Sequence, residues 1–144
     1  MSDAKYDALR LENQLCFPLY AAAREVVKRY RPYLDELDLT YTQYITMMVL
    51  WVERVITVKA LGERLFLDSG TMTPVLKSLE AKGYVIRQRS STDERSVSAV
   101  LTEAGEALRE RALEVPAKVA GCMSLDADEA LQLYRTLYKI LKTE

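Results

Sequence analysis

Two cysteines, Cys16 and Cys122, are the side chains of this sequence with the widest reactive chemistry. They lie far apart and form no CxxC pair, so a zinc site built from them would lack two ligands. The sequence contains no histidine, which excludes histidine-based triads, histidine metal ligands and imidazole acid–base catalysis. We therefore expect no metal site and no cofactor. From residue type alone, the cysteines are either small buried hydrophobes or redox-active thiols.

The composition is that of an ordinary globular protein, with 49% hydrophobic and 28% charged residues in a chain of 144. This length predicts a single domain over residues 1–144. No run of about 18 apolar residues is present and the first residues are polar, so we expect no membrane segment and a cytoplasmic location. The net charge of −1 does not indicate a nucleic-acid partner, so DNA binding must be argued from a local motif.

The segment that carries Cys16 is predicted to be a helix over residues 11–30, because its apolar side chains recur at the helical period. Pro18 lies inside this pattern and should either kink the helix or mark an early turn of it. We expect Pro32 to close the helix, with a short helix or turn after it.

Three further helices are predicted over residues 42–53, 58–65 and 71–82. The first is apolar enough to be a central element of the core. Pro74 is acceptable near the start of the third. The expected N-terminal caps are Thr40 or Thr42 for the first helix, Thr57 for the second, and Ser69 or Thr71 for the third.

After Gly83, which suits the left-handed position beyond a helix end, the hydrophobic period changes to two. Residues 84–89 and 96–101 alternate around a polar tip and predict a β-hairpin. Two C-terminal helices follow: a long one capped by Thr102 and interrupted at Pro116, and a last one over residues 126–142. The predicted fold class is mainly α with a small β-hairpin.

A short helix, a turn, a second helix and a hairpin together define a winged helix-turn-helix, whose second helix enters the major groove while the wing reaches the backbone or minor groove. The expected DNA contacts are Ser69, Thr71, Thr73 and Lys77 on the second helix and Arg87, Arg89, Asp93 and Arg95 on the wing. The Asp93 carboxylate would hold the guanidinium of Arg95 at the tip. The alternative is a helical hairpin packed on a β-hairpin, with its arginines merely solvated.

Residues 67–105, with Asp93–Arg95 followed by the LTEAG segment, resemble the helix-turn-helix and wing of the MarR family of regulators. Residues 11–34 and 39–44 are similar to one subgroup, the organic-hydroperoxide-resistance regulators (OhrR). The resemblance implies a homodimer in which residues 1–36 and 103–144 form the dimer interface and residues 40–102 form the winged helix-turn-helix. It also implies repression, at a palindromic operator, of a gene for peroxide detoxification.

The same resemblance places the reactive, peroxide-sensing cysteine at Cys16 and its tyrosine partners at Tyr30 and Tyr41, with Tyr20 one helical turn from Cys16. Phenol groups can donate hydrogen bonds to a thiolate while their rings form an apolar pocket that favours organic hydroperoxides. The GCMS segment around Cys122 is similar to the two-cysteine type of the subgroup. This implies a sulfenic acid at Cys16 that condenses to a disulfide with Cys122 of the other subunit, and release of the DNA.

Three alternatives remain open from the sequence. The first is a MarR-type repressor released by a small aromatic or phenolic ligand, with both cysteines inert. The second is a thiol peroxidase, for which a DNA-binding unit would be superfluous, so we expect no enzymatic activity. The third is a protein-interaction module, which would bind DNA weakly and with little dependence on salt.

Overall fold

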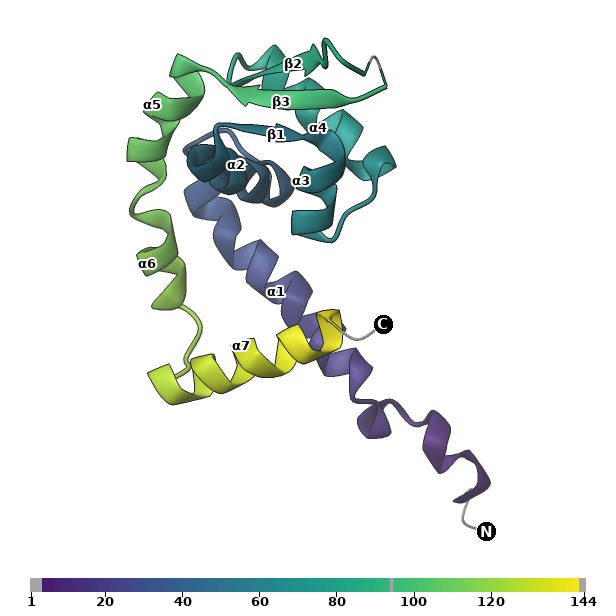
Figure 1. Cartoon of the computed structure of the whole chain (residues 1–144). Coiled ribbons are helices and arrows are strands. Elements are labelled where there is room, and N and C mark those ends of the chain that lie inside the picture. The colour runs from purple at the N-terminus through teal and green to yellow at the C-terminus, as the bar shows by residue number, and fades with distance from the viewer. Residues whose placement is uncertain (1–3, 94, 143–144) are drawn as a thin grey trace.

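The computed structural model describes residues 4–93 and 95–142 and divides into a winged-helix unit and long helical arms (Figure 1). The helices are α1 (Cys16–Asp35), α2 (Tyr41–Glu53), α3 (Val58–Leu65), α4 (Ser69–Ala81), α5 (Glu103–Ala112), α6 (Val115–Ala120) and α7 (Ala127–Leu141). The strands are β1 (Val55–Thr57), β2 (Val85–Arg89) and β3 (Val97–Leu101), and the 3-10 helices η1 (Ala4–Leu9) and η2 (Leu11–Asn13) precede α1.

Helix α1 begins and ends later than the sequence predicts. The expected start at Leu11 is wrong, because residues 11–13 form the 3-10 turn η2 and the α-helix begins at Cys16. Pro18 therefore lies in the first turn of α1, where a missing N–H removes no helical bond. The prediction that Pro32 closes the helix is also wrong: α1 continues through it to Asp35, where Leu34 is buried in the core.

Threonine caps fix the starts of three helices as predicted. The Thr40 hydroxyl accepts from the backbone N–H of Gln43 while the Gln43 side chain accepts from the Thr40 N–H, a complete capping box. The Thr57 hydroxyl caps α3, and the Thr102 hydroxyl caps α5 by accepting from the N–H of Gly105.

Helix α4 is capped by Asp68, so the prediction of Ser69 or Thr71 is wrong. Asp68 Oδ1 accepts from the backbone N–H of Thr71 at 2.7 Å, and a carboxylate suits the positive end of a helix better than a hydroxyl does. Because the helix begins at Ser69, Pro74 lies in its second turn, not its first.

The predicted hairpin is confirmed as β2 and β3, which pair antiparallel from Val85↔Leu101 to Arg89↔Val97. The sheet has a third strand that the sequence reasoning missed: β1 pairs antiparallel with β3, giving the order β1-β3-β2. Gly83 has φ +82°, which confirms its predicted left-handed position between α4 and β2.

The core lies between α2, α3, α4, α5 and the sheet, and it continues to the end of α1 and to α6 (Figure 1). Its fully buried side chains include Met47, Leu50, Leu61, Met72, Leu76, Leu79 and Val85. The buried indole N–H of Trp51 donates to the carbonyl of Gly105 at 2.8 Å and so joins α2 to α5.

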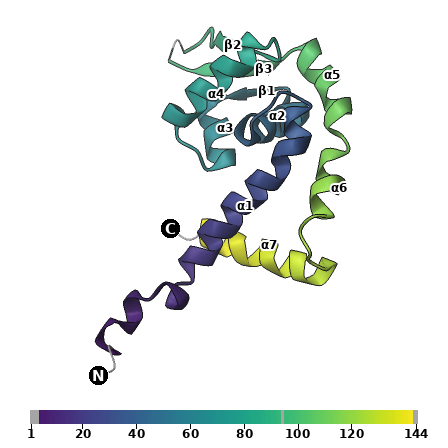
Figure 2. The same cartoon turned by 180° about the vertical axis from the view of Figure 1, so that it is seen from behind.

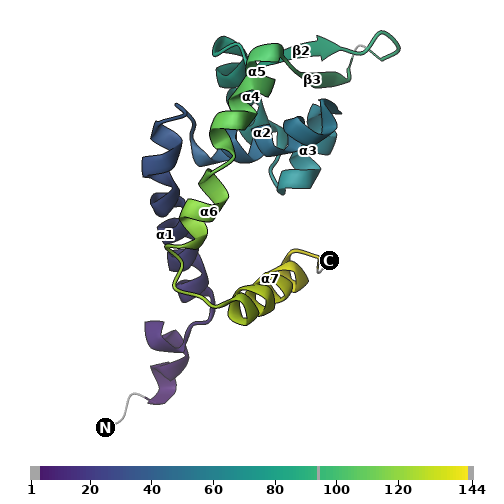
Figure 3. The ribbon, with the colours of Figure 1, turned by 90° about the vertical axis from the view of Figure 1, so that its left-hand side faces the viewer.

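The helical arms, formed by α1 and by α5 to α7, extend away from this core. Helix α1 leaves the unit on one side, α5 and α6 descend on the other, and α7 turns back below them (Figure 2). The view in Figure 3 shows α7 projecting away from α1. The predicted interruption near Pro116 is confirmed as the break between α5 and α6, with Pro116 in the first turn of α6. In the described part of the chain, no helix is long and apolar enough to cross a membrane.

Candidate DNA interface and thiol sites

A groove of about 950 Å³ opens between α3, α4 and the wing formed by β2 and β3. Five of the sequence-predicted DNA contacts line it: Ser69, Thr73, Arg87, Asp93 and Arg95. The other three, Thr71, Lys77 and Arg89, are exposed on α4 and β2. Five of the eight predicted contacts therefore share one groove, and the other three are exposed on the same two elements.

The wing tip is held by short-range hydrogen bonds. Ser90 Oγ accepts from the backbone N–H groups of Thr92 and Asp93, and Asp93 Oδ1 accepts from the backbone N–H of Arg95 at 3.0 Å. The Asp93 carboxylate thus orders the backbone of the turn, whereas the sequence expectation placed it on the Arg95 guanidinium. Arg95 remains exposed, and Glu94, the middle residue of the wing motif, lies outside the described residues.

Arg87 joins the wing to the recognition helix. Its guanidinium lies 3.2 Å from Glu80 Oε1 and its backbone N–H donates to Glu80 Oε2 at 2.9 Å. These hydrogen bonds, the backbone one foremost, lower the pKa of Glu80 and keep it ionised. Arg87 Nε is buried without a hydrogen-bond partner among the described residues. In this conformation Arg87 fixes β2 against α4, and its charge is shared with Glu80.

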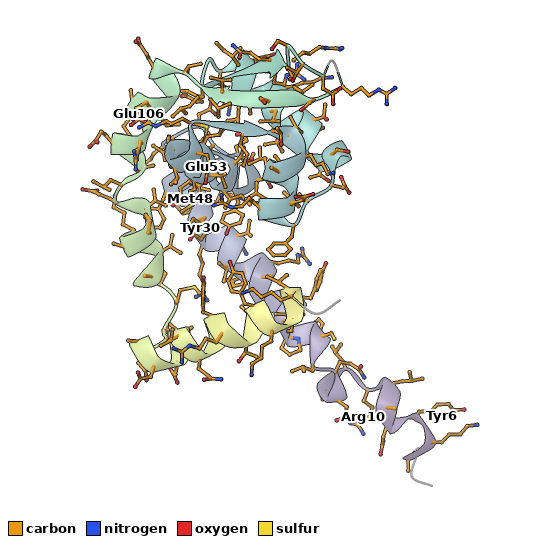
Figure 4. The ribbon with its side chains drawn as sticks, in the orientation of Figure 1. Tyr6, Arg10, Tyr30, Met48, Glu53 and Glu106 are labelled. Carbon is orange, nitrogen blue, oxygen red and sulfur yellow. The ribbon has the colours of Figure 1, made fainter. Side chains whose placement is uncertain are left out.

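Three tyrosine rings meet where α1 joins α2, and Figure 4 shows Tyr30 there. Tyr30 lies 5.0 Å from Tyr41 and 5.7 Å from Tyr44 between ring centroids. Sequence reasoning named Tyr30 and Tyr41 but missed Tyr44, which is almost fully buried. Burial raises the pKa of Tyr30 and Tyr41, and burial followed by the two neighbouring phenols raises that of Tyr44 to about 12. All three hydroxyls are therefore protonated donors at neutral pH.

A buried amide connects this tyrosine cluster with the recognition helix. Gln43 lies between Tyr41 and Tyr44 in α2 and is only 7% exposed. Its Nε2 donates to Ser78 Oγ of α4 at 2.9 Å, and its Oε1 accepts from Lys82 Nζ at 3.1 Å. The first turn of α2 and the end of α4 are therefore tied by hydrogen bonds that no solvent molecule easily replaces.

Cys16 is exposed at the first position of α1. Tyr20, one turn further on, is also exposed, and the Arg24 guanidinium lies 5.5 Å from the centre of its ring. Tyr30 lies fourteen residues beyond Cys16 in the same helix, roughly 21 Å along its axis. The tyrosine cluster of one chain is therefore out of reach of the Cys16 thiol of that chain.

Cys122 is exposed just beyond α6 and lies beside the second half of α1. Its Sγ lies 3.8 Å from the Tyr33 hydroxyl and donates to the Lys118 carbonyl at 3.4 Å. The Arg29 guanidinium donates to the Cys122 carbonyl at 2.6 Å. Tyr33 is about 25 Å from Cys16 along α1, and a disulfide needs Cα atoms within roughly 7 Å. The two thiols of one chain therefore lie too far apart to bond in this conformation.

An apolar pocket of about 420 Å³ lies between α1, α6 and the start of α7. Tyr30 contributes from α1, and Met123, the neighbour of Cys122, contributes from the other side. The remaining lining residues are Val26, Pro116, Val119, Ala120, Leu125, Asp126, Ala127 and Ala130. One chain thus presents a tyrosine and the Cys122 segment around the same apolar cavity. Among the described residues no cluster of acidic or cysteine side chains has the composition to bind a metal ion.

The winged helix-turn-helix, whose groove is lined by hydroxyl and charged side chains, is the fold of a DNA-binding transcriptional regulator. The family model of the transcriptional regulators SarA/Rot matches residues 28–111, more than half of the chain. The chain therefore belongs to these MarR-like winged-helix regulators.

Individual relatives agree with this assignment. The organic hydroperoxide resistance transcriptional regulator of Bacillus subtilis is 48% identical over 139 residues, covering 96% of this chain and 95% of that protein. The structure of reduced AbfR bound to DNA superposes with a TM-score of 0.79 at 36% identity, covering 96% of each chain. The structure of disulfide-formed AbfR superposes with a TM-score of 0.63 at 34% identity, covering 99% of this chain and 97% of that one. AbfR is a Staphylococcus epidermidis protein.

Proposed function

We propose that the protein is a homodimeric repressor of the two-cysteine, organic-hydroperoxide-sensing type, which releases a palindromic operator when Cys16 is oxidised. The observation that carries the proposal is the separation of the sensor parts within one chain. Tyr30 and the Cys122 segment border one apolar pocket, whereas Cys16 of the same chain lies some 20 Å or more away along α1. A second copy supplies the missing cysteine.

The arms carry the apolar surface that such a dimer would bury. No residue of α7 is buried, although Leu131, Tyr134 and Leu141 lie on one face of this helix. The N-terminal end of the chain is similarly uncovered, with Leu15 83% exposed. Exposed apolar surface of this extent is typical of an interface between subunits. We assign residues 1–36 and 103–144 to dimerisation on this basis.

In the dimer, Cys16 of one subunit is placed against the pocket of the other, near Tyr30 and Tyr41. The tyrosine hydroxyls donate to the thiolate, and the apolar lining accommodates the organic part of a hydroperoxide. The thiolate sulfur attacks the peroxide, the O–O bond breaks, and the products are a sulfenic acid on Cys16 and an alcohol once the leaving alkoxide takes a proton. Cys122, next to the pocket residue Met123, then condenses with the sulfenic acid, giving a disulfide and water.

DNA binding is assigned to the groove of the winged-helix unit. Ser69, Thr71, Thr73 and Lys77 contact base edges and phosphates from α4, and Arg89 and Arg95 reach the backbone or minor groove from the wing. Arg87 and Asp93 support this surface through Glu80 and through the backbone of the tip. Two such units in a dimer match a palindrome whose half-sites are one helical turn apart.

The relatives support the DNA-binding and thiol-sensing parts of this proposal. The Bacillus subtilis protein is named for organic hydroperoxide resistance. AbfR is described both reduced on DNA and in a disulfide form. The present chain superposes better on the reduced, DNA-bound form than on the disulfide form. Because the relatives are transcriptional regulators, we assign the thiol a sensing role and not a catalytic one.

The route from sensor to DNA passes through Gln43. The tyrosines that would contact the sensing thiol flank Gln43 in α2, and Gln43 binds Ser78 and Lys82 at the end of α4. A displacement of the tyrosine cluster on oxidation would therefore also displace the recognition helix. Since both half-sites must be engaged together, a small change in the separation of the two units lowers the affinity strongly.

The test is release of a fluorescent palindromic promoter fragment by an organic hydroperoxide, followed by anisotropy, for wild type, Cys16→Ser and Cys122→Ser. We expect wild type to release the fragment, dithiothreitol to restore binding, and Cys16→Ser to remain bound. Release that is equal in wild type and Cys16→Ser would contradict the thiol sensor and favour a repressor whose pocket binds a small aromatic ligand.

A further inference from the structure

The surroundings of Cys122 contain a feature that the proposed disulfide alone does not require. Within one chain the Tyr33 hydroxyl lies 3.8 Å from Cys122 Sγ, bringing together two residues far apart in the sequence. Tyr33 is on α1, in the last part of the helix before Leu34 anchors it in the core. Tyr33 is distinct from the tyrosine cluster of Tyr30, Tyr41 and Tyr44.

We propose that Tyr33 is the positioning residue of Cys122: the resting thiol donates to the Lys118 carbonyl, and the Tyr33 hydroxyl donates to the thiolate during disulfide formation. This inference rests on the proposed function, because the disulfide is the reaction in which Cys122 takes part.

The first state is visible in the geometry. Cys122 Sγ donates to the Lys118 carbonyl at 3.4 Å, and a hydrogen bond of this kind exists only for the protonated thiol. Two hydrogen bonds fix the backbone of Cys122. Its N–H donates to the Val119 carbonyl at 2.9 Å, and the Arg29 guanidinium donates to the Cys122 carbonyl. The resting thiol therefore has a defined place and a partner that favours the neutral, less nucleophilic form.

The second state needs a donor for the sulfur once its proton has left, and the Tyr33 hydroxyl is the side-chain group placed for it. The hydrogen bond with Cys122, and then the charge of a Cys122 thiolate, raise the pKa of Tyr33, so its hydroxyl stays protonated and can donate. Lys118 Nζ lies 5.8 Å from the centre of the Tyr33 ring, and Glu36 on α1 opposes its effect on Tyr33.

The other charged side chains near the Cys122 thiol belong to α1 and α6, and they are largely paired. On α1, Arg29 is paired with Glu25 at 3.3 Å, and Lys118 of α6 is paired with Glu114 at 3.2 Å. Because each cation faces a carboxylate, neither acts as an undivided charge on the thiol. Loss of the Tyr33 hydroxyl is then the change that removes a hydrogen-bond donor from the Cys122 thiolate.

Condensation of the Cys122 thiol with the Cys16 sulfenic acid needs no further reactant. An organic hydroperoxide has already converted Cys16 of the other subunit to its sulfenic acid. The Cys122 sulfur, its thiolate stabilised by the Tyr33 O–H, attacks the sulfenic sulfur, the S–O bond breaks, and the S–S bond forms. The departing hydroxide takes the proton that Cys122 has lost, so the products are one disulfide and one water.

The experiment compares Tyr33→Phe, which removes only the hydroxyl, with the control Tyr84→Phe, which removes a hydroxyl between α4 and β2. In a Cys16→Ser background Cys122 is the sole cysteine, and its alkylation by iodoacetamide is followed against pH. We expect Tyr33→Phe to raise the midpoint of this profile by about one pH unit, which slows alkylation at pH 7 about tenfold. An unchanged midpoint overturns the proposal.

The second arm uses the protein with both cysteines. After one equivalent of cumene hydroperoxide, sulfenic acid is trapped with dimedone and the disulfide is read on a non-reducing gel. We expect Tyr33→Phe to form the sulfenic acid at the wild-type rate and the disulfide about tenfold more slowly. A wild-type rate of disulfide formation in Tyr33→Phe overturns the role of Tyr33 alone. No disulfide in wild type overturns the proposed function and this role together, while the alkylation profile reports separately on the hydroxyl.

Discussion

The winged-helix unit and the ends of the helical arms differ in how they place their apolar residues. In the unit, Leu50, Leu61 and Leu76 are completely buried within a single chain. In the arms, Leu15 is 83% exposed and no residue of α7 is buried. Burying apolar surface contributes about 25 cal/mol per Å² to stability. The winged-helix unit gains this free energy within one chain, whereas the arms gain it only by association. The winged-helix unit is thus complete in one chain, whereas the thiol sensor that we propose needs two chains.

The largest effect is expected from substitutions on the exposed apolar face of α7. Leu131→Glu combined with Tyr134→Glu places two charges on the apolar face of α7. Burial of two such side chains is worth roughly 3–6 kcal/mol, so we expect the dimer dissociation constant to rise at least ~100-fold while the circular dichroism of the winged-helix unit is retained. Sedimentation velocity measures the change, and Gln132→Glu on the opposite face is the control. A variant that stays dimeric would place the interface elsewhere.

A truncation in the core should act on the other region. Leu50→Ala removes a completely buried side chain of α2, and we expect the free energy of unfolding to fall by about 2–5 kcal/mol. Val52 lies on the same helix but is 69% exposed, so Val52→Ala should change it by less than ~0.5 kcal/mol. Urea unfolding at one protein concentration gives both values. Similar losses in the two variants would mean that the exposed face of α2 is covered in the dimer.

The proposed DNA-binding groove is tested by removing a positive charge from it. Arg95 is exposed at the wing tip, and Arg95→Ala should weaken operator binding by about 1–3 kcal/mol and reduce its salt dependence. Arg109→Ala on α5 removes the same charge away from the groove and should leave affinity nearly unchanged. Fluorescence anisotropy at several salt concentrations distinguishes them. Equal weakening would show that net charge, and not the groove, governs binding.

The smallest effect concerns pH. The hydrogen bond from the backbone N–H of Thr71 lowers the pKa of Asp68 from its ordinary 3.8. Because the folded value lies below the unfolded one, the stabilisation is fully present at pH values above 3.8 and is lost as the pH falls through the folded pKa. Asp68→Ala should therefore reduce stability at pH 7 and much less at pH 2.5. Urea midpoints at the two pH values check this, and a constant difference would contradict it.

The sequence predicts the winged-helix unit well because its signals are local. Thr40, Thr57 and Thr102 cap helices through residues three positions away, and Gly83 is required by its own φ angle. The cap of α4 was misassigned because Asp68, Ser69 and Thr71 are all good caps within one turn, and only the packed helix selects among them. Strand β1 was missed because a three-residue strand has too little alternation to detect and forms only by pairing with β3.

The site could be predicted only in its parts. Cys16, Tyr30 and Tyr41 were assigned through a family resemblance, and the structure shows that one chain does not bring the thiol to the rings. Tyr33 and Tyr44 gave no signal, since their contacts depend on how α1 packs against α2 and α6. Arg87 looked like a free DNA contact because its partner, Glu80, lies in another element.

The central claim is that Cys16 of one subunit pairs with Cys122 of the other. A dimer of one Cys16→Ser chain and one Cys122→Ser chain, isolated by two affinity tags after co-expression, contains a single pair of this kind. After treatment with an organic hydroperoxide, we expect a cross-linked dimer on a non-reducing gel from this mixed protein and from neither variant alone. A mixed dimer without the cross-link, together with a wild-type disulfide that migrates as a monomer, would contradict the account.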